Sequence, residues 1–412
     1  MTVNTPSARL LDVTRLASRA GRGLTGVDRV ERAYLVQFLK DETTPLFGLA
    51  RTVPGYVLLD RAGLQSILDR VDGRQRWGFA DVASRLARRL TPMQQRADSD
   101  LRRFSMASAT RFGLRWLLRR NMPPGLAYLN IGHSNLTSRV LRAVRGVRDA
   151  RISVFIHDTI PLDYPEFQRE GTVERFRESL RRVGRNADLL IYNSARTKGD
   201  VERTLARWNM SVRGVVAHLG SDPAVPARSE LPFGLPPDRP YFVVVGTIEP
   251  RKNHALLLEV WDQLGEDMDP AEVPSLLICG ARGWRNEDVF ERLDALPADG
   301  PVRECPDLSD GALAALIQGA AGLLQPSFAE GFGLPPVEAA ALQTPVICAD
   351  LSVFHEVLGD IPIYLSPTDA YSWVTKIKML AKAEGRGTGT GPQSDYVPPS
   401  WQDHFNTVLR LT

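Results

Sequence analysis

Short, almost wholly apolar runs alternate along the chain with longer amphipathic stretches. We expect strands at 10–13, 55–60, 126–132, 151–157, 188–193 and 214–218, and later at 241–246, 275–280, 322–326, 345–349 and 361–365. Helix-like segments lie near 253–265, 287–296, 309–320, 335–343 and 369–383. Apolar strands that are connected by helices form parallel sheets, because helices then cover both faces of the sheet. The pattern therefore predicts an α/β protein.

A proline-rich segment, DPAVPARSELPFGLPPDRP at 222–240, interrupts this alternation and has the periodicity of neither helix nor strand. We expect an N-terminal Rossmann-like acceptor domain over 1–225, a linker over 226–240, a C-terminal Rossmann-like donor domain over 241–384, a flexible Gly-rich loop over 385–395 and a terminal helix over 396–412. A chain of 412 residues has room for two such domains. Ligands of open α/β sheets bind beyond the carboxyl ends of the strands, so chemistry is sought in the loops that follow strands.

The composition indicates the cellular compartment in which the protein works. The three cysteines, Cys279, Cys305 and Cys348, lie far apart and have no metal-ligand spacing, which fits a reducing compartment. Met1 is followed by a polar stretch rather than by a basic region and an apolar core. No run approaches the roughly 18 apolar residues of a spanning helix. We expect a cytoplasmic protein that is soluble or peripheral on the inner face of the membrane.

The segment 85–120 carries ten arginines against Asp98 and Asp100, with aromatic residues interleaved. Three interpretations stay open: the solvated face of a helical insertion, a surface that binds anionic lipid, or a contact with nucleic-acid phosphates. No nucleic-acid-binding module surrounds the segment, so no nucleic-acid partner is expected, and our hypothesis is membrane docking. The Asp-x-Asp element DSD at 98–100 could bind a metal–nucleotide complex, but it lies in this polar stretch rather than after a buried strand.

Two basic residues follow the predicted strand at 241–246, in the loop TIEPRKNH. Arg251 and Lys252 come directly before a predicted helix, whose free N–H groups already favour an anion. A guanidinium and an ammonium at such a position suit a diphosphate, because without an anion the helix dipole disfavours them. The alternative is a pair of exposed surface charges.

Two carboxylates stand eight positions apart in FAEGFGLPPVEAA, which follows the predicted strand at 322–326. Glu330 lies in the loop and Glu338 in the first turns of the next helix, where an acid near a proline-led helix start is also plain helix chemistry. Gly331 and Gly333 let the backbone approach a ligand, and the N–H groups of residues 332–334 can point at phosphate oxygens. Because a carboxylate accepts two hydrogen bonds, each glutamate suits a pair of sugar hydroxyls. The stretch favours a sugar nucleotide as ligand.

The elements VVVGTIEPRKNHALLLEVW, FAEGFGLPPVEAAALQTPVICAD and VFHEVLGD, in this order, resemble the donor-binding domain of glycosyltransferase family 4. The resemblance spans about 241–383. In the first half, VFIHDTIPLDYPEF resembles the family's histidine-containing loop and DLLIYNSARTKGDV its strand–serine–helix unit. DVTRLASRAGRGLTGVDRVERAY resembles a glycine-bearing first loop. The resemblance implies the GT-B fold, in which two Rossmann-like domains face each other across a cleft.

The resemblance also implies roles for individual residues. Arg251 and Lys252 hold the diphosphate, Glu330 contacts hydroxyls of the donor sugar, and Glu338 contacts the ribose. His157 lies near the reacting centre and positions the donor sugar. Further donor contacts are expected from Gly331, Phe332, Gly333, Leu334, Gly246 and Thr247, and contacts with the acceptor or its loops from Gly23, Gly26, Asp158 and His133.

Two positions qualify these expectations. Many family members carry an arginine directly after the glycine that ends VVVG, whereas this chain has Thr247. The diphosphate charge then falls on Arg251 and Lys252 alone. Ser194 is expected to cap a helix rather than to contact a ligand.

The function implied is a retaining, metal-independent hexosyltransferase of cell-surface polysaccharide synthesis. Its donor is expected to be a GDP- or UDP-linked hexose, with GDP-mannose slightly favoured, and its acceptor a glycan or lipid-linked glycan. No cofactor is expected beyond the nucleotide-sugar co-substrate, and fixed cations are expected to replace a metal. Two alternatives stay open: an inactive glycosyltransferase-like scaffold of a polysaccharide assembly complex, and a sugar-nucleotide epimerase of related fold.

Overall fold

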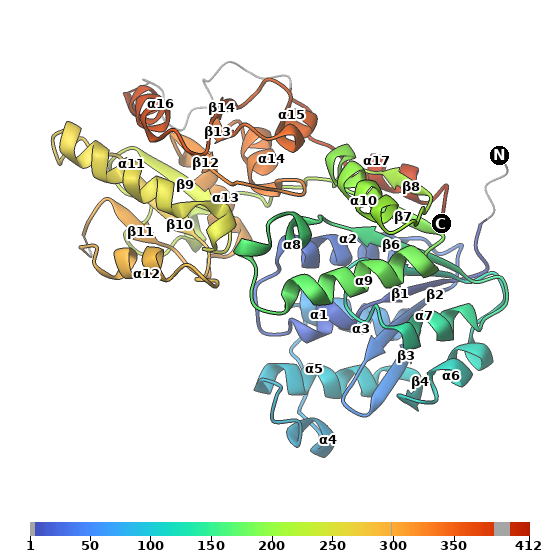
Figure 1. The fold of residues 1–412 in the computed structure, drawn as a ribbon. Coiled ribbons are helices and arrows are strands. Elements are labelled where there is room, and N and C mark those ends of the chain that lie inside the picture. The colour runs from blue at the N-terminus through green and yellow to red at the C-terminus, as the bar shows by residue number, and fades with distance from the viewer. Residues whose placement is uncertain (1–4, 298, 383–395) are drawn as a thin grey trace.

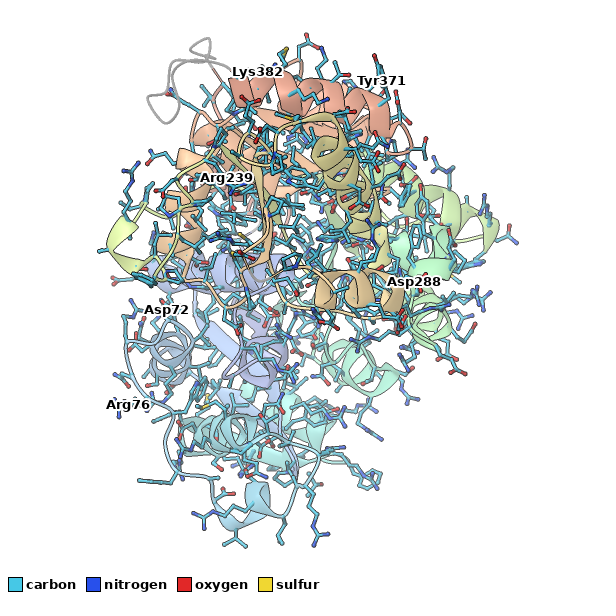
Figure 2. All side chains as sticks on the ribbon, turned by 90° about the vertical axis from the view of Figure 1, so that its left-hand side faces the viewer. Asp72, Arg76, Arg239, Asp288, Tyr371 and Lys382 are labelled. Carbon is cyan, nitrogen blue, oxygen red and sulfur yellow. The ribbon has the colours of Figure 1, made fainter. Side chains whose placement is uncertain are left out.

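The computed structural model describes residues 5–297, 299–382 and 396–412, so the predicted Gly-rich loop at 385–395 lies outside the described residues. Figure 1 shows two α/β domains, one above the other, which correspond to the two halves of the sequence. Figure 2 shows the molecule turned by 90°, with Asp72 and Arg76 on the lower domain and Arg239, Tyr371 and Lys382 on the upper.

An eight-stranded sheet in the order β4-β3-β2-β1-β5-β6-β7-β8 forms the centre of the N-terminal domain. Its strands are β1 (Arg9–Asp12), β2 (Leu46–Arg51), β3 (Gly55–Leu59), β4 (Ser105–Thr110), β5 (Ala127–Asn130), β6 (Arg151–Ile156), β7 (Leu189–Tyr192) and β8 (Gly214–Val216). All neighbours are parallel except that β3 pairs antiparallel with both β2 and β4. The two antiparallel steps leave β4 running in the same direction as β1.

Helices cover both faces of this sheet. They are α1 (Thr14–Ser18), α2 (Gly26–Lys40), α3 (Arg61–Val71), α4 (Val82–Arg85), α5 (Pro92–Arg103), α6 (Leu114–Asn121), α7 (Ser138–Arg145), α8 (Ile160–Asp163), α9 (Thr172–Asn186) and α10 (Ala195–Arg207), with a 3-10 turn η1 (Pro165–Phe167). Polar side chains start several of them: Asp60 accepts from the N–H of Gly63, and Ser194 accepts from the N–H of Thr197. The predicted cap at Ser194 is therefore confirmed.

The C-terminal domain contains a six-stranded, wholly parallel sheet in the order β11-β10-β9-β12-β13-β14. Its strands are β9 (Tyr241–Val245), β10 (Ser275–Cys279), β11 (Val302–Glu304), β12 (Gly322–Gln325), β13 (Val346–Ala349) and β14 (Ile363–Leu365). The helical elements are η2 (Arg228–Glu230) in the linker, η3 (Pro250–Lys252), α11 (His254–Asp267), α12 (Glu287–Asp294), α13 (Asp310–Gly319), α14 (Leu334–Ala341), α15 (Ser352–Leu358) and α16 (Ala370–Lys382). Parallel sheets in both domains confirm the predicted α/β class.

The last helix, α17 (Trp401–Val408), returns to the N-terminal domain. The ring of His404 is hydrogen-bonded to the hydroxyl of Tyr34 at 2.8 Å, and the ring of Phe405 lies 5.0 Å from that of Tyr34. Buried apolar residues continue from this contact to Phe332 and Phe354 of the C-terminal domain. The terminal segment therefore joins the two domains by packing as well as by chain connection.

The structure corrects two expectations. Segment 85–120 is not a helical insertion: it contains β4, the edge strand of the sheet, and the helices α5 and α6 that pack beside it. Strands β2, β4 and β11 and helix α15 are absent from the predicted elements. Glu338 is the fifth residue of α14 and lies within its first two turns. In the described parts of the chain, no helix is both long and apolar enough to cross a bilayer.

Candidate functional site

The loop after β9 in the C-terminal domain carries two cationic side chains. Arg251 and Lys252 lie in η3, and Asn253, in the left-handed conformation at φ 57°, separates them from α11. Gly246 has φ 131°, and a Cβ atom there would lie 3.3 Å from the Lys252 side chain. A glycine is therefore required for the stem of Lys252 to pass under the end of β9. Arg251 and Lys252 thus stand directly before the N-cap of α11, and the 3-10 turn that they form with Pro250 was not predicted.

Glu330 binds both cations from the loop after β12. Its carboxylate lies 2.8 Å from Arg251 and 2.6 Å from Lys252, and its side chain is 9% exposed. Burial would raise the pKa of Glu330, but Arg251 and Lys252 outweigh this effect and lower it to about 2. The resemblance implies that Glu330 contacts sugar hydroxyls; in the structure its carboxylate pairs with the two cations.

Further bonds hold this cluster rigid. Gln325 and Ser327 donate to the same oxygen of Glu330 at 3.0 and 2.8 Å. Arg251 also bonds to Glu249 at 2.6 Å and to the carbonyl of Ala329 at 2.6 Å. The guanidinium is thus engaged on both of its edges. The ammonium of Lys252 has three N–H groups and bonds only to Glu330 within the described chain, so it keeps free donors.

Backbone donors stand next to the cations at the start of α14. Gly333 caps this helix with φ 94°, and Pro335 and Pro336 follow Leu334. Because proline has no N–H, the backbone donors at this helix start come from residues 332–334 rather than from Pro335 and Pro336. These N–H groups bond to no acceptor in the described part of the chain. Their arrangement supports the predicted anion site.

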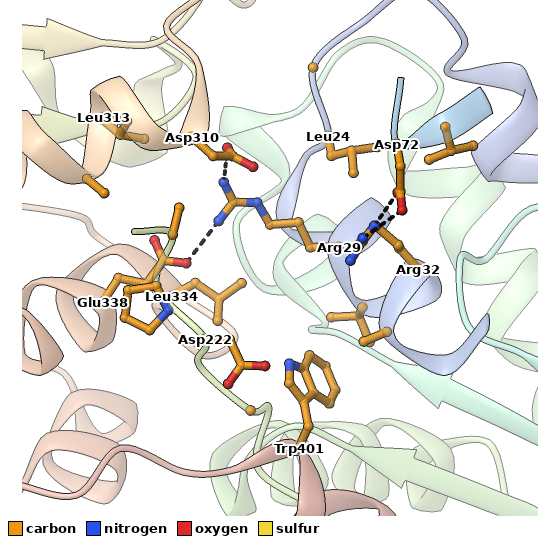
Figure 3. Close-up of a pocket in the computed structure, with 18 of the residues that line it drawn as sticks. Leu24, Arg29, Arg32, Asp72, Asp222, Asp310, Leu313, Leu334, Glu338 and Trp401 are labelled. Carbon is orange, nitrogen blue, oxygen red and sulfur yellow. Dashed lines mark hydrogen bonds and ion pairs between the residues drawn. The ribbon is translucent and has the colours of Figure 1, made fainter. Parts of the chain in front are cut away.

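Glu338 faces the N-terminal domain across a cavity of about 660 Å³ (Figure 3). Arg29 of α2 spans this cavity and bonds to Glu338 at 2.9 Å and to Asp310 of α13 at 2.6 Å. Burial raises the pKa of Glu338, although Arg29 opposes the shift. One oxygen of Glu338 accepts the bond from Arg29, which leaves the other for a ligand hydroxyl.

The N-terminal wall of the cleft comes from the loops after β5 and β6. His157 bonds to the carbonyl of Ile131 at 2.8 Å and His133 to that of Phe155 at 2.6 Å, and their rings lie 5.1 Å apart. Burial lowers the pKa of both rings, that of His133 to about 4, so both are neutral near pH 7. A neutral ring beside an anion site acts as a polar surface rather than as a charge.

Asp158 lies directly against the loop after β12, which carries Gly331. A Cβ atom at Gly331 would overlap the carbonyl oxygen of His157 and lie 3.1 Å from the Cβ of Asp158. The hydroxyl of Ser194 also donates to the carbonyl of Gly331 at 3.0 Å. Burial raises the pKa of Asp158 to about 6, while Arg251 opposes the shift. The two domains therefore meet at Gly331.

The remaining predicted residues have different surroundings. Gly23 lines the large cavity, and a Cβ atom at Gly26, the first residue of α2, would lie 3.6 Å from Leu334. The first glycine-bearing loop therefore reaches the cleft. Thr247 instead contacts Gly283 in the loop after β10, and Phe332 is 4% exposed with its ring 6.1 Å from that of His218. Both side chains pack away from the cations.

A second, smaller cavity of about 220 Å³ lies on the other side of Glu330. Its walls are the loop from Asp158 to Tyr164, the start of α10 and the loops after β12 and β13. Five acids line it together with Arg196: Asp158, Asp163, Asp200, Glu330 and Asp350. An acidic, half-enclosed space beside the cation cluster has the polarity that a sugar with many hydroxyl donors requires.

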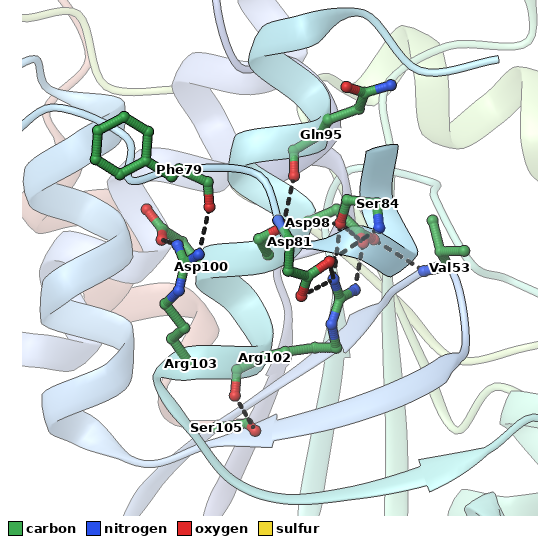
Figure 4. A network of polar contacts seen from close by, with 11 residues as sticks. Val53, Phe79, Asp81, Ser84, Gln95, Asp98, Asp100, Arg102, Arg103 and Ser105 are labelled. Carbon is green, nitrogen blue, oxygen red and sulfur yellow. Dashed lines mark hydrogen bonds and ion pairs between the residues drawn. The ribbon is translucent and has the colours of Figure 1, made fainter. Parts of the chain in front are cut away.

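The Asp-x-Asp element has a structural explanation (Figure 4). Asp98 accepts from the N–H of Val53 and from Ser84, and it pairs with Arg102. Asp100 pairs with Arg70 and Arg103 and accepts from the N–H of Gly78. Both carboxylates lie on α5 and hold the loop before it. They are buried within this network, which explains why acids occur in an Arg-rich segment.

Sequence reasoning missed Arg29 and Asp310, which bracket Glu338, and Glu249, which holds Arg251. Glu249 stands within TIEPRKN and could have been read as part of that motif. Arg29 is one of many arginines, and only the fold brings it near Glu338, 309 positions away.

Comparisons with known proteins match part of the chain to glycosyltransferases. Residues 229–385 match the family model described as glycosyl transferases group 1. A serotype-specific mannosyltransferase WbdA of Escherichia coli is 32% identical over 51% of this chain and 27% of its own length. The O-antigen chain mannosyltransferase RfbU of Salmonella typhimurium is 34% identical over 34% of this chain and 38% of its own length. The chain thus spans about a quarter to two fifths of these relatives.

Solved structures match over almost the whole chain. Anabaena HepE in complex with UDP and glucose aligns with a TM-score of 0.60 and 14% identity, covering 91% of this chain and 90% of HepE. A sucrose-phosphate synthase from Thermosynechococcus elongatus aligns with a TM-score of 0.59 and 16% identity, covering 91% and 92%. The protein has the GT-B fold of glycosyltransferases, and its C-terminal half is similar to glycosyl transferases group 1.

Proposed function

We propose that this protein transfers a hexose, with retention of configuration, from a nucleoside diphosphate sugar to a glycan or lipid-linked glycan acceptor of a cell-surface polysaccharide. The observation that carries the proposal is the cluster of Arg251, Lys252 and Glu330. It lies beside free N–H groups at the start of α14 and opposite the loop of His157. Two fixed cations and backbone donors can stabilise the charge that develops on a leaving diphosphate.

The donor would lie along the cleft with its ribose at Glu338 and its diphosphate at Lys252. The free N–H groups of Lys252 make it the first contact of the phosphates, and Arg251 holds Glu330 and the loop in place. Mannose is the favoured sugar and GDP the favoured nucleotide, because the relatives WbdA and RfbU are named mannosyltransferases. UDP is the alternative, since HepE was solved with UDP and glucose.

The transfer would proceed on one face of the sugar. The bond between the anomeric carbon and the diphosphate oxygen breaks, and the electron pair leaves with the nucleoside diphosphate. The acceptor oxygen forms the new bond from the same face and gives its proton to the departing phosphate oxygen. Lys252 and the N–H groups of residues 332–334 stabilise the departing charge, so the proposed reaction needs no metal. We further propose that the enzyme works in the cytoplasm, at the inner face of the membrane.

Incubation with GDP-mannose, UDP-glucose and other sugar nucleotides, together with mannose-containing and lipid-linked acceptors, tests this proposal. We expect release of nucleoside diphosphate, a product heavier by one hexose, and a linkage that keeps the donor's anomeric configuration in NMR spectra. Glu330→Gln should lower the rate more than a hundredfold, whereas Glu174→Gln on the surface of α9 should not. Donor binding without any transfer would favour the scaffold function, and an inverted product would refute retention.

A further inference from the structure

We infer that the face formed by β4, α6 and α7 docks the protein on an anionic lipid bilayer; this rests on the proposed function in so far as the bilayer presents the acceptor. Between Leu101 and Arg148 the chain has ten arginines and not one aspartate, glutamate or lysine. Membrane surfaces that carry anionic lipids attract such single-signed faces. The face differs from segment 85–120 because it leaves out α4 and includes α7.

Most of these arginines have no carboxylate partner in the described part of the chain. Four of the ten form ion pairs: Arg102, Arg103, Arg145 and Arg148. The other six pair with none of the carboxylates that the structure describes, and all six are exposed: Arg111, Arg115, Arg119, Arg120, Arg139 and Arg142. Six unpaired charges on one face repel each other, so an external anionic surface would stabilise them.

Two large aromatic side chains stand among these charges. Phe112, in the turn between β4 and α6, is 76% exposed, and Trp116 of α6 is 61% exposed. The guanidinium of Arg111 lies 4.8 Å and that of Arg139 5.8 Å from the ring centre of Phe112, and Arg120 lies 5.3 Å from that of Trp116. Exposed aromatic rings beside arginines are typical of the boundary between lipid headgroups and acyl chains.

The helices α6 and α7 make one continuous surface. They pack against each other, and Figure 1 shows both on the same flank of the N-terminal domain. Leu114, Leu117 and Leu118 turn inward from α6, while Arg115, Trp116 and Arg119 point outward. Neither cavity described above lies on this flank. A helical surface that lines neither of these cavities fits a bilayer better than a single nucleic-acid strand, which is bound in a groove.

The position of the face relative to the cleft suits a membrane-bound acceptor. Because β4 runs in the same direction as β1, the turn at Phe112 leaves the sheet at the same edge as the loops that carry Gly23 and His157. Arg139 begins α7 at this edge as well. An acceptor that is held at the bilayer surface would therefore approach the cleft from the side of the acceptor loops.

Sedimentation of the full chain with large vesicles tests the inference. We expect binding to vesicles of phosphatidylcholine with 30% phosphatidylglycerol, weak binding to phosphatidylcholine alone, and weaker binding at higher salt. The triple variant R115S/R119S/R120S should lower the partition coefficient by roughly a hundredfold, since each basic residue near such a surface contributes about fivefold. The double variant F112S/W116S should remove the residual binding at high salt.

Two further triple variants, which remove the same number of charges elsewhere, test where the membrane-binding surface lies. R185S/R207S/R213S removes three exposed arginines elsewhere, loses the same net charge and should bind as the wild type does. R85S/R88S/R89S changes α4 and the turn after it, and loss of binding in this variant alone would overturn the inference. Stronger binding to duplex or single-stranded nucleic acid than to the anionic vesicles would also overturn it. Nucleotide-induced thermal stabilisation, measured on the same variants, reports separately on the donor site.

Discussion

Replacement of Lys252 by methionine tests the anion site at the cation that keeps free N–H groups. The side chain is 10% exposed, its ammonium lies 2.6 Å from Glu330, and its stem passes under Gly246. Methionine keeps the length and apolar character of the stem and removes only the charge and the donors. The variant therefore separates packing from electrostatics.

The expected effects follow from the partners that remain. Breaking a buried ion pair typically costs about 3–5 kcal/mol, and we expect about 3 kcal/mol of unfolding free energy because Glu330 keeps Arg251, Ser327 and Gln325. The loss of one donor to the leaving phosphate should lower kcat by about a hundredfold to a thousandfold. The pKa of Glu330, now about 2, should also rise. A carboxylate whose pKa is lower in the folded than in the unfolded protein stabilises the fold at pH values above its unfolded pKa, and this stabilisation is lost as the pH falls. Because the pKa of Glu330 is less depressed in the variant, the variant should lose less stability than the wild type when the pH falls below 4.

Thermal unfolding at several pH values measures the changes in stability, the transfer assay measures kcat, and calorimetric titration with GDP and UDP measures nucleotide affinity. Lys378→Met is the control: its ammonium lies 2.7 Å from Asp267 at the surface, so we expect a stability change below about 1 kcal/mol and unchanged nucleotide affinity. If Lys252→Met folds and binds the nucleoside diphosphate within about twofold of the wild type, Lys252 does not hold the phosphates.

Three further predictions concern the cleft. A bound anion favours the protonated form of Asp158, whose pKa is already raised to about 6, so the affinity for a sugar nucleotide should rise as the pH falls from 7 to 5.5. Asp158→Asn should flatten this pH profile in titration calorimetry. An unchanged slope would contradict the role of Asp158. Gly331→Ala should lower the unfolding free energy, measured in thermal melts, by about 1–3 kcal/mol, because the new methyl group overlaps the carbonyl of His157. The control Gly199→Ala in α10, where the nearest neighbour of the new methyl group is 3.9 Å away, should not destabilise the protein. Arg29→Met removes both ion pairs across the large cavity and should increase the radius of gyration of the free protein in solution scattering; an unchanged radius would show that these pairs do not hold the domains together.

The apolar runs were sufficient to predict most of the fold. Every predicted strand is present, because buried parallel strands consist of continuous apolar residues that stand out in the sequence. β4 was missed because its sequence, SMASAT, is small and polar and alternates between half-buried and exposed positions at the sheet edge. The same strand shows why segment 85–120 was taken for an insertion.

The site was predictable where its residues share a short motif and unpredictable where they do not. The loops with Arg251, Lys252 and Glu330 follow neighbouring strands, so their approach follows from parallel topology. The ion pair between Glu330 and Lys252 was not foreseen, because a carboxylate suits sugar hydroxyls and cations equally well. Contacts such as Arg29 with Glu338 depend on how the domains meet, which no local pattern records.

The central claim is that the cleft binds a sugar nucleotide, with Glu338 at its ribose. Thermal stabilisation of the wild type and of Glu338→Ala by a panel of nucleoside diphosphates and sugar nucleotides tests it most directly. A ligand at a hundred times its Kd should stabilise the wild type by about 2.7 kcal/mol, and one base should stand out. The account predicts that Glu338→Ala loses most of this shift while its own melting stays near that of the wild type. No stabilisation of the wild type by any nucleotide at millimolar concentration would contradict it.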